Sequence, residues 1–295
     1  MFTEQRNPNS MGIDQQPTLQ ILEIMNTEDA TVAGVVRQTL PAVAQAVELI
    51  ADRLRAGGRL IYIGAGTSGR LGILDAVECL PTFSVDPEMV QGIIAGGEGA
   101  IMRSVEGAED DPQAGKSDLQ AINLTGQDAV VGIAASGRTP YVVGALRYAN
   151  EVEAGTVAIS CNSPAPILDV ATIRIAALVG PEILTGSTRL KAGTAQKLIL
   201  NMISTATMIK LGKVYNNLMV DVRVSNQKLA DRARGIVSEI TGITVDEAAA
   251  LLDQTGQEVK PAVVMAILGL SANEARRRLA EEQGMLAQVI HANAP

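Results

Sequence analysis

The stretch that decides the fold is Leu60-Ile61-Tyr62-Ile63-Gly64-Ala65-Gly66-Thr67-Ser68-Gly69-Arg70. Four apolar residues run directly into a glycine-rich turn, and an apolar segment with helical periodicity follows to about Cys79. The order strand, glycine-rich turn and helix is the start of a βαβ unit. We therefore expect residues 60 to 63 to form a strand of a parallel sheet.

The same arrangement recurs farther along the chain. Residues 129 to 134 are apolar, and Ala135-Ser136-Gly137-Arg138-Thr139-Pro140 leads from them into a second helical segment ending near Val152. Further strands are expected at residues 92 to 95, 156 to 160 and 172 to 176. Apolar strands that alternate with helices predict an α/β fold, with a parallel sheet covered by helices on both faces. Ligands of such sheets bind at the carboxyl ends of the strands.

The segments on either side of this region have a different character. Residues 1 to 17 are polar and are expected to form an irregular N-terminal arm. Residues 191 to 213 predict a long helix that is apolar nearly all round and is buried partly in an oligomer interface. A Thr-Gly break then opens a series of short helices with two capping-box patterns. We accordingly assign residues 18 to 240 to the sheet-containing domain and residues 241 to 295 to a small helical module.

The composition argues against several classes of protein. The 295 residues carry a formal net charge of −8 and include four Tyr, two Phe and no Trp, whereas a nucleic-acid binder needs a basic surface with stacking aromatics. No apolar run reaches the roughly 20 residues that cross a bilayer, so no membrane partner is expected. The first residues lack a secretory pattern, and Cys79 and Cys161 cannot build a disulfide framework. These features predict a cytoplasmic protein.

The chain contains one histidine, His291, close to its C-terminal end. A Ser-His-Asp triad, a histidine zinc site and a histidine general base are therefore not expected. Acid–base chemistry would fall to carboxylates, lysine or tyrosine.

The first glycine-rich turn has three interpretations. Gly64, Gly66 and Gly69 match the G-x-G-x-x-G dinucleotide fingerprint. The turn could instead be a tight passage from strand to helix, with Thr67 or Ser68 as the N-cap. It could also hold a phosphate monoester on backbone N–H groups and these two hydroxyls. The second hydroxyl-bearing turn favours the monoester, because a dinucleotide site ordinarily uses one such loop and an acidic residue about 20 positions farther on.

Three cations accompany these turns. Arg70 and Arg138 each follow a glycine directly, so they either contact a phosphate or are solvated surface charges. Lys191 opens the long apolar helix, where a cation opposes the helix dipole and needs a carboxylate or a bound anion as its partner. The candidate substrate-binding and phosphate-binding residues are Gly66, Thr67, Ser68, Gly69, Arg70, Ser136, Gly137, Arg138, Thr139 and Lys191.

Two groups of acidic residues are candidates for catalysis or for solvated helix surfaces. Asp75 and Glu78 lie three residues apart and so share one face of the first helix. Glu78 lies about 15 Å of helix rise from Thr67, and a hexose phosphate spans this distance only in part. The distance would be reconciled if the helix bends, if it starts late, or if a dimer partner contributes to the site. The second group comprises Glu106, Glu109, Asp110 and Asp111.

Six segments together resemble the sugar isomerase (SIS) domain superfamily and, within it, the N-acetylmuramic acid 6-phosphate etherase family. They are residues 64–72 (GAGTSGRLG), 74–79 (LDAVEC), 105–110 (VEGAED), 134–140 (AASGRTP), 191–197 (KAGTAQK) and 217–221 (NLMVD). They span most of the chain in the family's order, and Leu80 departs from it where a proline is expected. The resemblance implies a flavodoxin-like sheet, a C-terminal three-helix UBA-like module, a homodimer, and no metal or other cofactor.

The resemblance also implies a reaction: cleavage of the D-lactyl ether of N-acetylmuramic acid 6-phosphate to N-acetylglucosamine 6-phosphate and D-lactate. The family's two functional glutamates carry over to Glu78 and Glu109. Elimination across C2–C3 of the open-chain sugar needs a base for the C2 proton and an acid for the departing oxygen. We expect Glu109 to be the base, and Glu78 to be the acid that later activates the water.

Two other functions fit the same phosphosugar turns. A non-catalytic SIS regulator would bind a phosphosugar and act on a protein partner, and an aldose–ketose phosphate isomerase would use a carboxylate at C2. The regulator has no need of two glutamates, so their joint presence favours the enzyme. Release of free D-lactate distinguishes all three functions.

Overall fold

The computed structural model describes residues 1 to 222, 224 and 226 to 291. The chain folds into two compact units. We call Met1–Val77 with Pro87–Ser204 the sheet unit, and Glu78–Asp86 with Thr205–Pro295 the helical unit.

The sheet unit is built on a parallel sheet, as the alternation of strands and helices predicts. In the described part of the chain, five strands form this sheet in the order β2-β1-β3-β4-β5, and each neighbouring pair is parallel. The strands are β1 (Leu60–Gly64), β2 (Val90–Ile94), β3 (Ala129–Ile133), β4 (Gly155–Ser160) and β5 (Ile173–Ala176). Every residue of β1, β3 and β4 is buried, which explains their nearly continuous apolar sequence.

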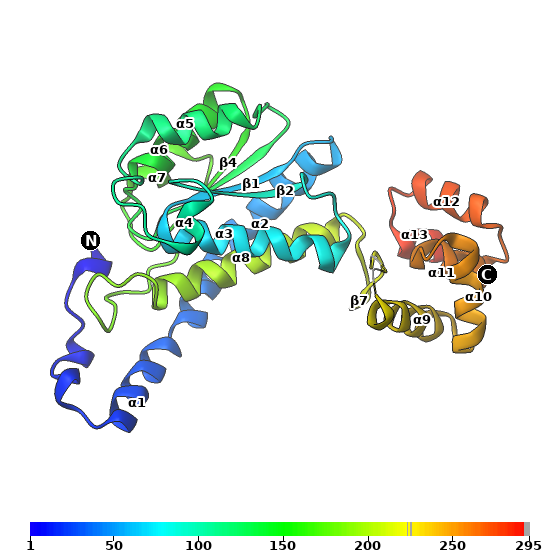
Figure 1. Cartoon of the computed structure of the whole chain (residues 1–295), viewed down its shortest axis with the longest axis horizontal. Helices are drawn as coiled ribbons and strands as arrows, with labels where there is room; N and C mark the ends of the chain where they lie inside the picture. Colours follow the sequence, from blue (N-terminus) through cyan, green and yellow to red (C-terminus); the bar gives the residue numbers. More distant parts are fainter. Residues whose placement is uncertain (223, 225, 292–295) are drawn as a thin grey trace. The chain divides into compact units, whose positions relative to one another are not determined.

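Helices cover both faces of the sheet (Figure 1). On one face lie α5 (Pro112–Ala121), α6 (Pro140–Glu151) and α7 (Pro166–Val170), where Ile61 and Ile63 share a core with Val142 and Leu146. On the other face lie α2 (Val32–Arg55), α3 (Gly66–Phe83) and α8 (Lys191–Lys210). Residue 72 of α3 is glycine because a Cβ there would lie 2.9 Å from the Cβ of Tyr62. The expected α/β architecture is therefore confirmed.

The helix expected over residues 191 to 213 is α8, which ends at Lys210. Ala195, Ile199 and Ile203 follow one another at four-residue spacing and are fully buried, whereas Met202 is 37% exposed. Among the described residues, no helix combines the length and the hydropathy needed to span a membrane.

The N-terminal arm expected over residues 1 to 17 is held by distant partners. Short 3-10 helices form at Phe2–Glu4, Pro8–Ser10 and Ile13–Gln15, before α1 (Thr18–Asp29). Thr3 is fully buried, and its hydroxyl accepts a hydrogen bond from the Asn162 side chain at 3.0 Å. The polarity of the arm therefore reflects polar contacts to residues more than 150 positions away, which local sequence does not reveal.

The helical unit begins earlier in the chain than the expected boundary after residue 240. Its elements are the hairpin β6 (Val214–Tyr215) and β7 (Leu218–Met219), with α9 (Gln227–Thr241), α10 (Val245–Thr255), α11 (Val259–Leu268), α12 (Ala272–Glu281) and α13 (Leu286–His291). Val237 of α9 shares one core with Leu252, Val263 and Leu279. Both expected capping boxes form, at Thr244 and at Ser271, and the additional helix α13 completes the core.

Candidate active site

The first glycine-rich turn connects β1 to α3 and is tightly packed. Gly66 has a φ of +54°, and a Cβ at Gly69 would lie 2.6 Å from Cγ1 of Ile94 and 2.8 Å from the carbonyl oxygen of Gly64. The Ser68 side chain is buried, and its hydroxyl donates to Oε1 of Gln196 on α8 at 3.0 Å. The turn is thus fixed by close backbone approach and by the hydrogen bond that Ser68 donates to a distant helix.

The second turn connects β3 to α6 and is more open. Ser136 is half-buried, Arg138 is exposed, and the backbone N–H of Arg138 donates to Oγ of Ser136 at 3.2 Å. Gly137 has a φ of +70°, and a Cβ at this position would lie 2.4 Å from Cβ of Ala165. Thr139 is the N-cap of α6, but its side chain makes no capping hydrogen bond. Its hydroxyl is therefore not used to satisfy the helix start.

The sheet order brings the two turns together. β1 and β3 are hydrogen-bonded neighbours, with Gly64 paired to Ile133 at their carboxyl ends. The strand order reverses between β1 and β3, so the two turns leave the sheet on either side of its switch point. In open α/β sheets the crevice at this point is where ligands bind.

Glu109 belongs to the same edge of the sheet. A cavity of about 290 Å³ lies beside the first turn. Its lining residues are Ala65, Gly66, Arg70, Ala95, Ala100, Ser104, Val105, Glu106, Gly107, Ala108 and Glu109. The carbonyl oxygen of Glu109 also accepts a hydrogen bond from the backbone N–H of Tyr141, in the first turn of α6, at 3.0 Å. Glu109 is therefore tied to the helix that follows the second turn and lines a cavity at the first.

Arg70 lines this cavity but is also held by the main chain. Its Nε donates to the carbonyl of Ile101 at 2.8 Å, and its Nη2 donates to the carbonyl of Ala100 at 2.7 Å. These carbonyls belong to α4 (Gly99–Met102), a short helix at the rim of the cavity. Arg70 therefore fixes the segment that carries the acidic residues.

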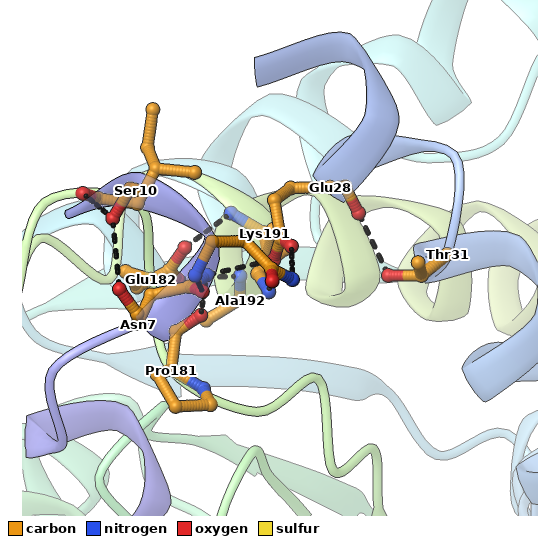
Figure 2. A network of polar contacts seen from close by, with 10 residues as sticks. Asn7, Ser10, Glu28, Thr31, Pro181, Glu182, Lys191 and Ala192 are labelled. Carbon is orange, nitrogen blue, oxygen red and sulfur yellow. Dashed lines mark hydrogen bonds and ion pairs between the residues drawn. The ribbon is translucent and has the colours of Figure 1, made fainter. Parts of the chain in front are cut away.

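Lys191 has a carboxylate partner, which was one of the two alternatives for this cation. Its Nζ lies 2.6 Å from Oε2 of Glu28, and both side chains are buried (Figure 2). The side chains of Asn7 and Asn9 donate to the same carboxylate, each at 2.8 Å. Burial alone would raise the pKa of Glu28, but the hydrogen bonds from Lys191, Asn9 and Asn7 outweigh it and hold the pKa below its ordinary value. Lys191 thus joins α1 to α8, and the arm is attached to the same carboxylate through Asn7 and Asn9.

Glu182 caps the start of α8 (Figure 2). Its two carboxylate oxygens accept hydrogen bonds from the backbone N–H groups of Lys191 and Ala192, both at 2.9 Å. Burial raises the pKa of Glu182, although these N–H groups and the charge of Lys191 act in the opposite direction. A carboxylate of the protein therefore occupies the helix end at which an anion would otherwise bind.

Glu78 has a different environment from Glu109. It lies in the fourth turn of α3, is exposed, and is assigned to the helical unit. Asp75, one turn earlier, is buried, and its Oδ1 accepts hydrogen bonds from Asn201 at 2.7 Å and Ser204 at 3.2 Å. Asp75 therefore binds α3 to α8, and Glu78 projects from an exposed position of the same helix.

Sequence reasoning missed two polar residues of this region. Ser104 lines the cavity beside Glu106 and Glu109, and only the fold shows it. Gln196 is fully buried on α8, and its Nε2 has no hydrogen-bond partner among the described residues. The signal for Gln196 was its place in the 191–197 segment, which the resemblance had singled out. In the described part of the chain, no group of three or more His, Cys, Asp or Glu side chains is placed to hold a metal ion.

Comparisons with known proteins agree with this architecture. The model of the glucokinase regulatory protein N-terminal SIS domain matches residues 42–150. The N-acetylmuramic acid 6-phosphate etherase of Serratia proteamaculans is 58% identical over 290 residues, which is 98% of each chain. The etherase of Pectobacterium atrosepticum is 56% identical over 98% of this chain and 96% of its own. A phosphoheptose isomerase from Francisella tularensis superposes with a TM-score of 0.53 at 17% identity, over 66% of this chain and all of that one, and so shares the fold.

Proposed function

This chain belongs to the N-acetylmuramic acid 6-phosphate etherase family, and we propose that it cleaves the D-lactyl ether of N-acetylmuramic acid 6-phosphate. The products are N-acetylglucosamine 6-phosphate and D-lactate. The enzyme is a carbon–oxygen lyase that acts on an amino sugar phosphate.

One observation supports the assignment to specific residues. Two hydroxyl-bearing turns leave neighbouring strands at the switch point of the sheet, and Glu109 is hydrogen-bonded to the helix that follows one of them while lining the cavity beside the other. A phosphate anchored between the turns would thus have a carboxylate nearby, on the same edge of the sheet.

The 6-phosphate is held by the start of α3 and by the turn that precedes α6. At the start of α3, backbone N–H groups point toward the bound anion. The hydroxyls of Thr67, Ser136 and Thr139 donate further hydrogen bonds to it. Ser68 does so by turning its hydroxyl from Gln196 to the phosphate. Gly66 faces open space and lets the backbone approach the phosphate closely, whereas Gly69 and Gly137 allow the two turns to pack against the protein. The exposed Arg138 adds a positive charge at the second turn, and Arg70 holds the α4 segment in place.

The reaction begins on the open-chain form of the sugar. The C1 aldehyde acidifies the C2 proton, and the Glu109 carboxylate removes that proton while the C3–O bond breaks. The carboxyl group of Glu78 donates a proton to the departing oxygen, so D-lactate leaves and a C2–C3 double bond remains. Two glutamates divide the work of base and acid, which is the usual solution where histidine is absent.

The second half of the reaction restores the sugar. Water adds to C3 of the unsaturated aldehyde, and Glu78, now a carboxylate, accepts a proton from that water. Glu109 returns its proton to C2. Each glutamate ends in its starting protonation state, so the cycle consumes one water and no other reactant.

Sequence similarity favours this lyase over the other phosphosugar functions. The match to the SIS domain of glucokinase regulatory protein covers 109 residues, whereas the etherases match 98% of the chain at 56% to 58% identity. The isomerase shares the fold at 17% identity. Neither a regulator nor an isomerase explains similarity that extends through the helical unit.

We further propose that the active enzyme is a homodimer in which Glu78 serves the partner's cavity. Leu74 is 54% exposed and lies one helical turn before Glu78, on the same face of α3. Val77 on α3 and Met202 on α8 are also exposed apolar side chains. A second copy covering these side chains would bury apolar surface and carry Glu78 toward Glu109 of the other chain.

Mixing two inactive variants tests this arrangement. The Glu78→Gln and Glu109→Gln variants are unfolded separately, mixed in equal amounts and then refolded. If each site combines residues of two subunits, mixed dimers contain one intact site, and about a quarter of the wild-type activity returns. No recovery in a mixture shown to contain mixed dimers would place both glutamates in one subunit.

The function itself is tested by incubating the enzyme with N-acetylmuramic acid 6-phosphate and measuring free D-lactate. Lactate release is expected, and its absence under conditions in which a known etherase is active would refute the assignment. We propose that the enzyme works in the cytoplasm, since its two cysteines, Cys79 and Cys161, cannot build a disulfide framework.

A further inference from the structure

The helical unit contains a cavity that the lyase reaction does not use. Its volume is about 590 Å³, within the range of small-molecule sites. The lining residues are Ser84, Lys213, Val220, Asp221, Val222, Val224, Gly256, Gln257, Glu258, Val259, Lys260, Pro261, Arg276, Leu279, Ala280 and Gly284. Asp221 closes the 217–221 segment, whose role the active site leaves unexplained.

Two lysines in this cavity share one carboxylate oxygen. Nζ of Lys213 and Nζ of Lys260 each lie 3.0 Å from Oδ2 of Asp221. One negative charge therefore faces two positive charges on the same side. The second carboxylate of the lining, Glu258, is already paired with Arg276, at 2.8 Å. The charged lining residues together carry an excess of one positive charge, in a chain whose formal net charge is −8.

The excess charge lies where solvent does little to screen it. The Lys260 side chain is 10% exposed, and those of Lys213 and Asp221 are about one-fifth exposed. Burial lowers the pKa of Lys260, and the nearby charge of Lys213 lowers it further, while Asp221 opposes both. A second anion beside these lysines would complete the charge balance that Asp221 only half provides.

We propose that this cavity binds a phosphorylated small molecule, with its phosphate on Lys213 and Lys260. A phosphate monoester carries nearly two negative charges, and it can accept hydrogen bonds from both ammonium groups at once. Val220, Val222 and Leu279 form apolar walls that would contact the carbon skeleton of the ligand. The site lies wholly within the helical unit, so it is separate from the turns of the sheet unit.

Residue-resolved NMR of the full chain tests this site, with inorganic phosphate as the probe. The amide signals of Gly256 and Gly284 report on the cavity, and those of Gly66 and Gly137 report on the two turns of the sheet unit. We expect saturable shifts at Gly256 and Gly284 on titration. Absence of saturable shifts at these two glycines would overturn the proposal, whatever happens at Gly66 and Gly137. Failure of the active-site assignment alone would leave the shifts at Gly256 and Gly284 intact.

Variants identify the groups responsible. Lys260→Met and Lys213→Met should each raise the phosphate Kd measured at Gly256 and Gly284 by about tenfold or more. Lys116→Met removes the same charge from a surface pair with Glu151 and should leave that Kd unchanged. An unchanged Kd in folded Lys213→Met would contradict the proposal, even if Lys260→Met failed to fold. D-lactate is the carboxylate probe, and tighter binding of lactate than of phosphate at these glycines would refute the choice of phosphate.

Discussion

The two hydroxyl-bearing turns occupy equivalent places after β1 and β3, but their hydroxyls are held differently. Ser68 in the first turn is buried and bonded to Gln196, which comes from α8. Ser136 in the second turn is half-buried and bonded to the backbone N–H of Arg138, two residues away. One hydroxyl is positioned by tertiary structure and the other by its own turn.

Because of this difference, substitutions in the two turns should affect substrate binding and protein stability to different extents. A group held by its own turn can be removed without disturbing distant elements, whereas Ser68 is also a link between α3 and α8. Substitutions in the first turn should therefore affect folding and substrate binding together, and substitutions at the surface of the second turn should affect binding alone.

Glu109 connects the two turns, and its substitution should reduce the activity more than any other change considered below. Glu109→Gln removes the proposed base while keeping the shape of the side chain, so the rate of D-lactate release should fall about 10³-fold. Glu106→Gln, at another carboxylate lining the same cavity, is the matched control and should stay within about threefold of wild type. Exchange of C2–H with deuterated water should vanish in Glu109→Gln and persist in Glu78→Gln. The reverse pattern would exchange the roles of the two glutamates.

The start of α8 supports the first turn, and the ion pair between Lys191 and Glu28 should contribute to the stability of the fold there. Glu28→Gln leaves Lys191 buried without its counter-ion, so the free energy of unfolding should fall by about 3 kcal/mol at neutral pH. Because the folded pKa of Glu28 lies below its ordinary value, the wild-type advantage is complete above the unfolded pKa. It is lost as pH falls through the folded pKa. Urea unfolding of both proteins from about pH 7 to about pH 3 measures this. A difference that stays constant over that range would show that the Glu28 charge is irrelevant.

Glycines with positive φ in the two turns should differ in their tolerance of a side chain. Gly66 has no atom within 4 Å of an added Cβ, so Gly66→Ala should cost about 1 kcal/mol, from backbone strain alone. Gly137→Ala adds a clash with Ala165 and should cost about 2 kcal/mol more. Chemical denaturation of the two variants gives the comparison directly. Equal losses would mean that the second turn relaxes freely around the new methyl group.

The serines themselves should give the smallest effects. Ser68→Ala and Ser136→Ala should each raise KM about tenfold with little change in kcat, because a uniform binding contact is lost. Only Ser68→Ala should also lower stability, by about 1 kcal/mol, since it leaves Oε1 of Gln196 without its donor. Unchanged KM in both variants would show that the phosphate binds elsewhere.

The sequence predicted most of the sheet because its strands carry local signals. Residues 60 to 63 and 129 to 134 are apolar runs that end in glycine-bearing turns, and they correspond to β1 and β3. The sequence did not predict α5 or α13. Helix α13 is only six residues long, and α5 is positioned by close packing on α6 rather than by an apolar pattern. A Cβ at Gly115 of α5 would lie 2.0 Å from the carbonyl oxygen of Tyr141.

The candidate site was predictable only as separate pieces. The turns could be recognised in the chain, and the two glutamates were proposed from the family resemblance, but the pairing of β1 with β3 was needed to bring the turns together. The partner of Lys191 is Glu28, 163 residues away, and no local pattern indicates it. Polar contacts over such separations depend on the packed fold, so sequence could state that Lys191 needs a partner without saying which.

The carboxylate of Glu182 at the start of α8 has a consequence for substrate selection. The starts of α3 and α8 both offer partial positive charge, and the protein supplies its own resident anion at α8. An incoming phosphate would therefore have to displace a tethered carboxylate in order to bind at α8. The Glu182 carboxylate would thus disfavour binding of the substrate phosphate at the start of α8.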